Sequence, residues 1–173
     1  MHPTLSRLIR PFYDPQPFLD HFSVSQRAFR SASGQPYVGH VPGLRERVYF
    51  WRHTYPEETA PGSRSKINTR ELRMVQCLVQ HLVQHGVLQR SVTIITPYLG
   101  QCRALRSVMR FSALSDVKVS TVDLFQGDEN DIVILSLVRT AKLTEFIRMR
   151  NRLIVSCSRA RFAFVIVGND TLL

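Results

Sequence analysis

Residues 119–138, VSTVDLFQGDENDIVILSLV, place a polar, acidic segment between two stretches that have the composition of buried strands. The second stretch, 132–138, is almost continuously apolar, which is typical of a strand covered on both faces in a parallel sheet. Ligands of open parallel sheets bind at strand ends, on loops such as 123–131. This loop is therefore a candidate site. The alternative interpretation is a solvated turn whose acids keep it soluble.

The rest of the chain alternates expected strands with expected helices. Strands are predicted at 48–51, 91–96, 117–121, 132–138 and 162–167, and helices at 1–10, 68–85, 100–111 and 151–160. Pro11 is expected to end the first helix, and Asn68 with Glu71 resembles a capping box at the start of the second. This order predicts an α/β fold with a mostly parallel sheet of about five strands. Right-handed crossovers are expected to place the functional loops along one edge.

A single domain over residues 1–173 is expected, because this length buries a sufficient core. Residues 14–66 mix Pro, Gly, Ser and aromatic side chains without a period, which predicts an irregular excursion around the strand at 48–51. We expect Phe12, Phe18 and Phe22 to anchor it to the core. Residues 170–173 form a tail.

Arginine dominates the charge of the chain. Lysine and arginine together number 23 against 13 acidic residues, a formal net charge of +10. Arginine presents a planar fork of donors that suits phosphate, so nucleic acid or a nucleotide is the favoured partner, although an anionic membrane would satisfy charge alone. Arg103, Arg106 and Arg110 share one side of the helix expected at 100–111, and we interpret them as a solvated face.

Cysteine and histidine spacing predicts neither disulfides nor a metal site. Cys77, Cys102 and Cys157 are widely separated, which favours a reducing compartment. His81 and His85 lie four apart without an evident third ligand. No signal peptide and no apolar run of about 18 residues is present, so an intracellular protein, cytoplasmic or nuclear and without a membrane partner, is expected.

Arg159 is the candidate catalytic side chain. The sequence holds neither a G-x-x-x-x-G-K-[ST] phosphate loop nor a G-x-G-x-x-G motif, so a self-sufficient nucleotide site is not expected. Arg159 has small neighbours, Ser158 and Ala160, which would let it reach a nucleotide held by another domain as an arginine finger. The alternative is an arginine that interacts with the dipole at a helix C-terminus.

Three stretches carry a family resemblance: TIITPYLGQ (93–101), VDLFQGDENDIVILSLVR (122–139) and NRLIVSCSRARFAFVIVGN (151–169). Together they resemble the second RecA-like domain of superfamily 1 helicases, within these the Upf-type subgroup that includes the NFX-type zinc-finger helicases. Met1 to Pro3 and the pair Asn68 and Glu71 are similar to two further family motifs. Ser156 and Cys157 depart from the family pattern but are apolar enough to pack.

The resemblance implies a three-layer RecA-like fold and a site for ATP with Mg²⁺ that is shared with a first RecA-like domain, which is expected to be missing here together with its phosphate loop and Mg²⁺-binding acid. Glu129 would contact the ribose and Arg159 the γ-phosphate, beside Gln126 and Gly127. The residues implied to grip single-stranded RNA or DNA are Thr96, Pro97, Tyr98, Ser120, Thr121 and Arg139. ATP hydrolysis by this chain alone is not expected.

The favoured hypothesis is the C-terminal motor half of an ATP-dependent helicase, isolated from a longer protein or encoded by a truncated gene. A second hypothesis is a catalytically silent module that binds nucleic acid within a complex. A third is a metal-dependent nuclease built on Asp123, Asp128, Glu129 and Asp131, which lacks lysine and histidine partners.

Overall fold

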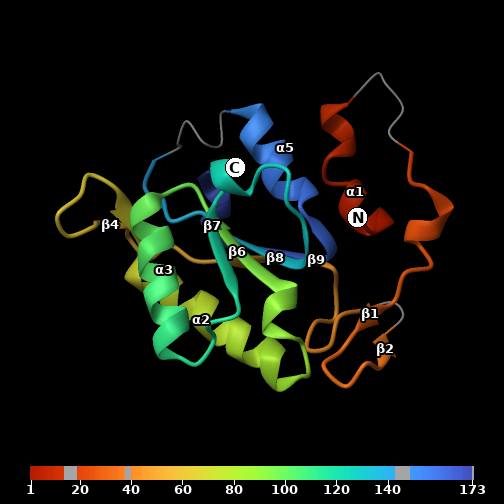
Figure 1. The fold of residues 1–173 in the computed structure, drawn as a ribbon. Coiled ribbons are helices and arrows are strands. Elements are labelled where there is room, and N and C mark those ends of the chain that lie inside the picture. Colours follow the sequence, from red (N-terminus) through yellow and green to blue (C-terminus); the bar gives the residue numbers. More distant parts are fainter. Residues whose placement is uncertain (14–18, 38–39, 143–148, 173) are drawn as a thin grey trace.

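A five-stranded parallel sheet forms the centre of the molecule, as the sequence predicts (Figure 1). The computed structural model describes residues 1–13, 19–37, 40–142 and 149–172. The strands run in the order β3-β9-β8-β6-β7, and every neighbouring pair is parallel. Their bounds are β3 Val48–Arg52, β6 Val92–Thr96, β7 Lys118–Thr121, β8 Asn130–Ser136 and β9 Ala160–Gly168.

Helices cover both faces of this sheet and make the three layers. Helices α2 (Thr69–Gln84) and α3 (Leu99–Phe111) pack on one face, and α1 (Pro3–Ser6) and α5 (Arg150–Ser158) pack on the other (Figure 1). Successive strand residues divide between the two cores: Ile94 joins the α2–α3 side and Ile95 the α1–α5 side. Both faces are therefore dry, which explains why the strands lack polar alternation.

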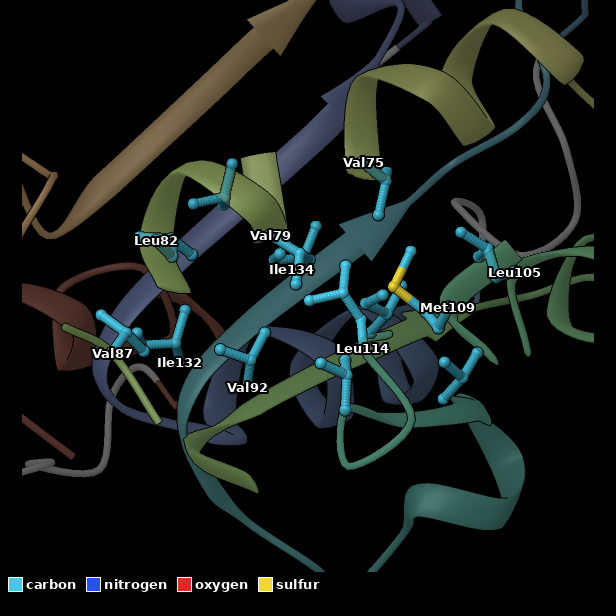
Figure 2. Packing of buried hydrophobic residues seen from close by; sticks show 14 of the residues in the cluster. Val75, Val79, Leu82, Val87, Val92, Leu105, Met109, Leu114, Ile132 and Ile134 are labelled. Carbon is cyan, nitrogen blue, oxygen red and sulfur yellow. The ribbon is translucent and has the colours of Figure 1, made fainter. Parts of the chain in front are cut away.

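The larger core lies between the sheet and the helix pair α2–α3. Figure 2 shows Val75, Val79 and Leu82 of α2 pointing at Ile132 and Ile134 of β8, and all five are fully buried. The apolar residues of α2 recur at helical spacing, so one stripe of the helix meets the sheet while its opposite face remains in water.

Short elements complete the described chain. Two antiparallel pairs, β1 (Phe29–Arg30) with β2 (Pro36–Tyr37) and β4 (Glu58–Thr59) with β5 (Lys66–Ile67), fall within or at the end of the excursion predicted at 14–66. The single-turn 3-10 helices are η1 Arg10–Phe12, η2 Phe22–Val24, η3 Gln89–Ser91, η4 Asp123–Phe125 and η5 Asp170–Leu172.

Two local predictions about the N-terminal region were wrong. Helix α1 ends at Ser6, and Pro11 lies inside η1 instead of ending a longer helix. Phe22 is 76% exposed and anchors nothing, because η2 turns its ring outward beside His21. Phe12 does pack against the α1–α5 core, as expected. Phe18 lies outside the described residues.

The start of α2 realises half of the expected capping box. Asn68 is the N-cap, and its side-chain oxygen accepts from the backbone N–H of Glu71 at 3.0 Å. The carboxylate of Glu71 does not return to the backbone N–H of Asn68, which instead donates to Gln101 at 2.9 Å. The carboxylate of Glu71 is therefore available for other hydrogen bonds, and the residue is fully buried.

The thiols differ sharply in access. Burial raises the pKa of Cys157 to about 12, and burial raises the pKa of Cys102 against the opposing charges of Arg106 and Arg103. Cys77 is exposed on α2. Since the thiolate is the nucleophile, we expect one fast thiol at pH 8 in a titration with a chromogenic disulfide, lost in Cys77→Ser, and the other two only after denaturation. Fast reaction of the Cys77→Ser variant would contradict the buried placement.

Within the part of the chain that the structure describes, no helix has the length and apolar character needed to cross a membrane.

Candidate functional site

The sequence-predicted site residues lie at opposite edges of the sheet. Thr96 ends β6, Thr121 ends β7 and Arg139 follows β8, all at the carboxyl edge. Gln126 to Glu129 precede β8 and Arg159 precedes β9, at the amino edge. The expectation of functional loops along one edge was therefore wrong. Because β7 and β8 are both parallel to β6, residues 122–129 must return from one edge to the other.

The amino edge brings the two predicted nucleotide motifs into contact. The backbone N–H of Asn130 donates to the carbonyl of Arg159 at 3.0 Å, and Nη1 of Arg159 donates to the carbonyl of Asp128 at 3.4 Å. Residues thirty positions apart thus share one surface. Gln126, Gly127 and Glu129 are exposed on it. Gly127 has a φ of 93° with open space around it, so glycine is required by the turn and not by close packing.

Arg159 also makes the helix-end interaction that the alternative interpretation describes. It is the C-cap residue of α5, and its Nε donates to the carbonyl of Val155 at 3.0 Å. The side chain is half-buried. To reach a ligand beyond the loop, the guanidinium would exchange this bond for one to the ligand, at a cost of about 1 kcal/mol. The finger role of Arg159 stays a prediction.

Positive side chains surround the loop before β8. Lys118 pairs with Asp128 at 2.5 Å and lies over the ring of Phe125. Arg161 lies 3.5 Å from the carboxylate of Glu129 and 2.9 Å from that of Asp131. The carboxylates of Asp128, Glu129 and Asp131 are thus each paired with a cation, so the negative charge of this loop is offset in place.

The hollow beside this loop is too small to enclose a nucleotide. Its volume is about 190 Å³, and it is lined by Val122, Asp123, Gln126, Asn151, Arg152 and Val155. Enclosed ligand pockets are typically about 300–1,000 Å³. This hollow therefore does not enclose a nucleotide by itself.

The carboxyl edge holds the residues predicted to grip nucleic acid. Pro97, Tyr98 and Thr121 are partly exposed, whereas Thr96 and Ser120 are buried. The carbonyl of Thr96 accepts from the backbone N–H of Val122 at 3.1 Å, and its hydroxyl lies 3.5 Å from the backbone N–H of Tyr98. In this structure Thr96 shapes the loops, and the exposed surface comes from its neighbours.

Arg139 stands on a strained turn at the same edge. Its backbone N–H donates to the carbonyl of Leu137 at 2.8 Å, across Val138, whose φ is 71°. A β-branched residue in this conformation is an outlier that costs on the order of 1–3 kcal/mol and persists only where surroundings impose it. Leu137 packs directly on Gly168, where an added Cβ would lie 2.8 Å from it, so this close approach requires glycine.

Glu57 fixes the guanidinium of Arg139. The Nε atom lies 2.6 Å from the carboxylate of Glu57, which also accepts from the backbone N–H and hydroxyl of Thr140 at 3.0 Å. Burial alone would raise the pKa of Glu57, but these hydrogen bonds and the charge of Arg139 leave that pKa lowered. Arg139 is therefore held in one place as a half-buried cation.

Glu71 holds the strained turn at Val138 in place, a role that the sequence analysis did not identify. Its carboxylate accepts from the backbone N–H of Val138 at 3.1 and 3.2 Å and from the hydroxyl of Ser136 at 2.5 Å. His53 is buried and contacts the same carboxylate at 2.8 Å. The similarity of Asn68 and Glu71 to a family motif was the only signal of this network.

The acids of the nuclease hypothesis are dispersed over separate ion pairs. Asp123 pairs with Arg152, Asp128 with Lys118, and Glu129 and Asp131 with Arg161. Among the residues with described positions, no group of three or more His, Cys, Asp or Glu side chains is arranged to hold a metal ion.

Comparison with known proteins gives one consistent family. A family model described as an AAA domain matches residues 1–171. The chain is 32% identical over 175 residues to mouse NFX1-type zinc finger-containing protein 1, covering 100% of this chain and 8% of that protein. It is 34% identical over 178 residues to the Schizosaccharomyces pombe helicase required for RNAi-mediated heterochromatin assembly 1, covering 99% and 16%.

Two further similarities are more partial. Regulator of nonsense transcripts 1 from Dictyostelium discoideum is 34% identical over 140 residues, which cover 76% of this chain and 10% of that protein. A solved structure, the C-terminal domain of a possible DNA helicase from Lactobacillus plantarum WCFS1, matches at 17% identity and a TM-score of 0.48 over 76% of each chain. The chain thus spans a small part of the length of its curated relatives.

Proposed function

This chain belongs to the AAA domain family, with helicases among its relatives, and we propose that it acts as the C-terminal motor half of an ATP-dependent helicase. The observation that carries the proposal is the contact at the amino edge, where Arg159 touches the loop of Gln126, Gly127 and Glu129. Two motifs that the resemblance assigns to one nucleotide meet there in space.

ATP with Mg²⁺ would lie between this amino edge and a first RecA-like domain that supplies a phosphate loop. The residues present fit half of such a site, since the exposed Gln126 amide can donate and accept hydrogen bonds and the Glu129 carboxylate can accept them beside a guanidinium. ATP would supply a γ-phosphoryl group whose transition state spreads charge over its equatorial oxygens. Arg159 would donate to those oxygens once the two domains close.

The carboxyl edge would hold single-stranded RNA or DNA. Tyr98 offers a ring for base stacking, and Arg139 offers a fixed cation for a phosphate. Buried Thr96 and Ser120 would act by holding these loops in shape, while Thr121 lies partly exposed between them and the crossover.

Residues 122–129 would couple the two ligands mechanically. This segment joins the end of β7 at the strand-binding edge to the start of β8 at the nucleotide edge, and Val122 and Phe125 pack it into the α1–α5 core. A packed segment transmits displacement better than a solvated loop. Closure on ATP would then alter the grip on the strand, as a motor requires.

Hydrolysis by a fused protein tests this proposal. We expect this chain alone to hydrolyse no ATP, and its fusion to a first RecA-like domain of an NFX1-type relative to hydrolyse ATP at a rate that rises when single-stranded RNA or DNA is added. A fusion that binds strands but never hydrolyses ATP above the rate of the first domain alone would favour the silent binding module instead.

A further inference from the structure

A hollow on the outer face of α3 lies outside both edges of the sheet. Its volume is about 510 Å³, and it is lined by Arg103, Arg106, Ser107, Arg110 and Phe111. The three arginines are spaced three and four residues apart, so they lie on one side of the helix and span about 10 Å along its axis. The stripe interpreted as a solvated face thus borders a concave surface.

Within the described ranges, no carboxylate forms an ion pair with the arginines of this hollow. Helix α3 contains no acidic residue. Among the described residues, ion pairs engage other cations but not Arg103, Arg106 or Arg110; the paired ones are Arg10, Arg52, Lys118, Arg139, Arg152 and Arg161. Three neighbouring cations without acids repel one another, and an anionic ligand relieves that repulsion.

Arg106 is pre-oriented for such a ligand. Its Nε and Nη2 atoms donate to the carbonyl of Val119 on the edge strand β7 at 3.0 and 2.9 Å. A long side chain that is already held loses less conformational freedom on binding than a free one. The middle cation of the stripe is therefore the best placed of the three.

Phe111 gives the hollow a feature that free phosphate or an acidic polypeptide would not need. It is the last residue of α3 and is 90% exposed beside the arginines. Exposed aromatic rings beside a basic groove are the arrangement on which single-stranded bases stack. Cations for phosphates and a ring for a base together favour a nucleic-acid strand.

We propose that this surface is a second binding site for single-stranded nucleic acid, with phosphates on the three arginines and a base on Phe111. Helix α3 begins at Leu99, directly after Pro97 and Tyr98, so a strand held at the carboxyl edge can continue along the helix. The inference rests on the proposed strand-binding function and extends it to a surface that the family resemblance does not implicate.

Fluorescence anisotropy of a labelled oligothymidylate or oligouridylate, titrated with this chain at several salt concentrations, tests the proposal. Each phosphate contact contributes a salt slope of about −0.7 for single strands. Arg103→Gln with Arg110→Gln is expected to weaken binding about tenfold or more and to flatten the slope by about 1.4. Phe111→Ala is expected to weaken binding about tenfold with the slope unchanged.

Arg73→Gln is the matched control, because it removes one exposed arginine from α2 and should leave the slope unchanged. All these positions are exposed, so thermal unfolding should not change. The proposal is overturned if the α3 variants bind the oligonucleotide as tightly as Arg73→Gln does. It is also overturned if polyglutamate displaces the oligonucleotide and does so equally well from the unmodified chain and from Phe111→Ala. If only Tyr98→Ala loses binding, the proposed strand site at the carboxyl edge stands and the second site on α3 is excluded.

Discussion

Replacing Glu71 by alanine is expected to lower the free energy of unfolding by about 3–5 kcal/mol, the range for removing one partner of a buried charged network. The carboxylate is fully buried and accepts from Val138, Ser136 and His53. Its removal leaves the backbone N–H of Val138 unpaired, in a turn that already carries strain. Urea denaturation followed by circular dichroism measures the change.

Two further variants serve as comparisons for Glu71→Ala: Glu71→Gln and Glu58→Ala. The glutamine keeps one acceptor oxygen but loses the charge, so an intermediate loss of stability is expected. Glu58 is an exposed acid in β4, and its replacement should change stability by less than about 0.5 kcal/mol. If Glu71→Ala unfolds at the same urea concentration as Glu58→Ala, the anchoring role assigned to Glu71 is wrong.

The stability experiment also addresses function, because Glu71 accepts from the backbone N–H of Val138, the residue before Arg139. In Glu71→Gln, we expect the turn at Val138 to relax and the proposed contact of Arg139 with a strand to weaken, although the fold remains. Strand affinity should then fall more than stability does. This split separates positioning of the site from general support of the core.

Replacing Arg159 by alanine is expected to reduce strand-stimulated ATP hydrolysis by about 10³–10⁵-fold in a protein that joins this chain to a first RecA-like domain, the range for loss of an arginine finger. The guanidinium is placed beside the loop of Gln126 to Glu129 and would compensate charge that develops only during phosphoryl transfer. The turnover number, measured with saturating ATP and strand, reports this loss.

Two variants show whether such a loss arises from chemistry. Arg159→Lys keeps the charge but not the planar fork, so only a small part of the rate should return. Arg73→Gln, on the exposed face of α2, should hydrolyse ATP at the unmodified rate. Arg159→Ala forfeits a bond to Val155 worth about 1 kcal/mol, so the variant should remain folded. A turnover number that survives Arg159→Ala would refute the assignment.

The fold was predictable because its signals are local. Apolar runs such as 132–135 and the helical period of Val75, Val79 and Leu82 depend on neighbours in the sequence, and both are confirmed. The prediction that Phe22 anchors to the core was wrong, because an irregular segment has no periodicity that indicates which way an aromatic side chain points. Composition alone could not separate its 3-10 turn from an anchor.

The arrangement of the site was less predictable because it depends on distant pairings. The family resemblance assigned Gln126, Glu129 and Arg159 to one site, and that assignment stays a prediction. Their separation from Tyr98 by the length of the strands follows only from the parallel pairing of β7, β6 and β8. The role of Glu71 rests on contact with Val138, 67 positions away. No pattern within either segment indicates that contact.

The affinity of the fused protein for a transition-state analogue tests the central claim most directly. Enzymes bind such analogues more tightly than substrates because the stabilising groups act on the transition state. With ADP and aluminium fluoride, Arg159→Ala is predicted to weaken binding by about 10²-fold or more, while affinity for a non-hydrolysable ATP analogue stays within a few-fold. Equal affinities of the unmodified protein and the variant for the transition-state analogue would contradict the account.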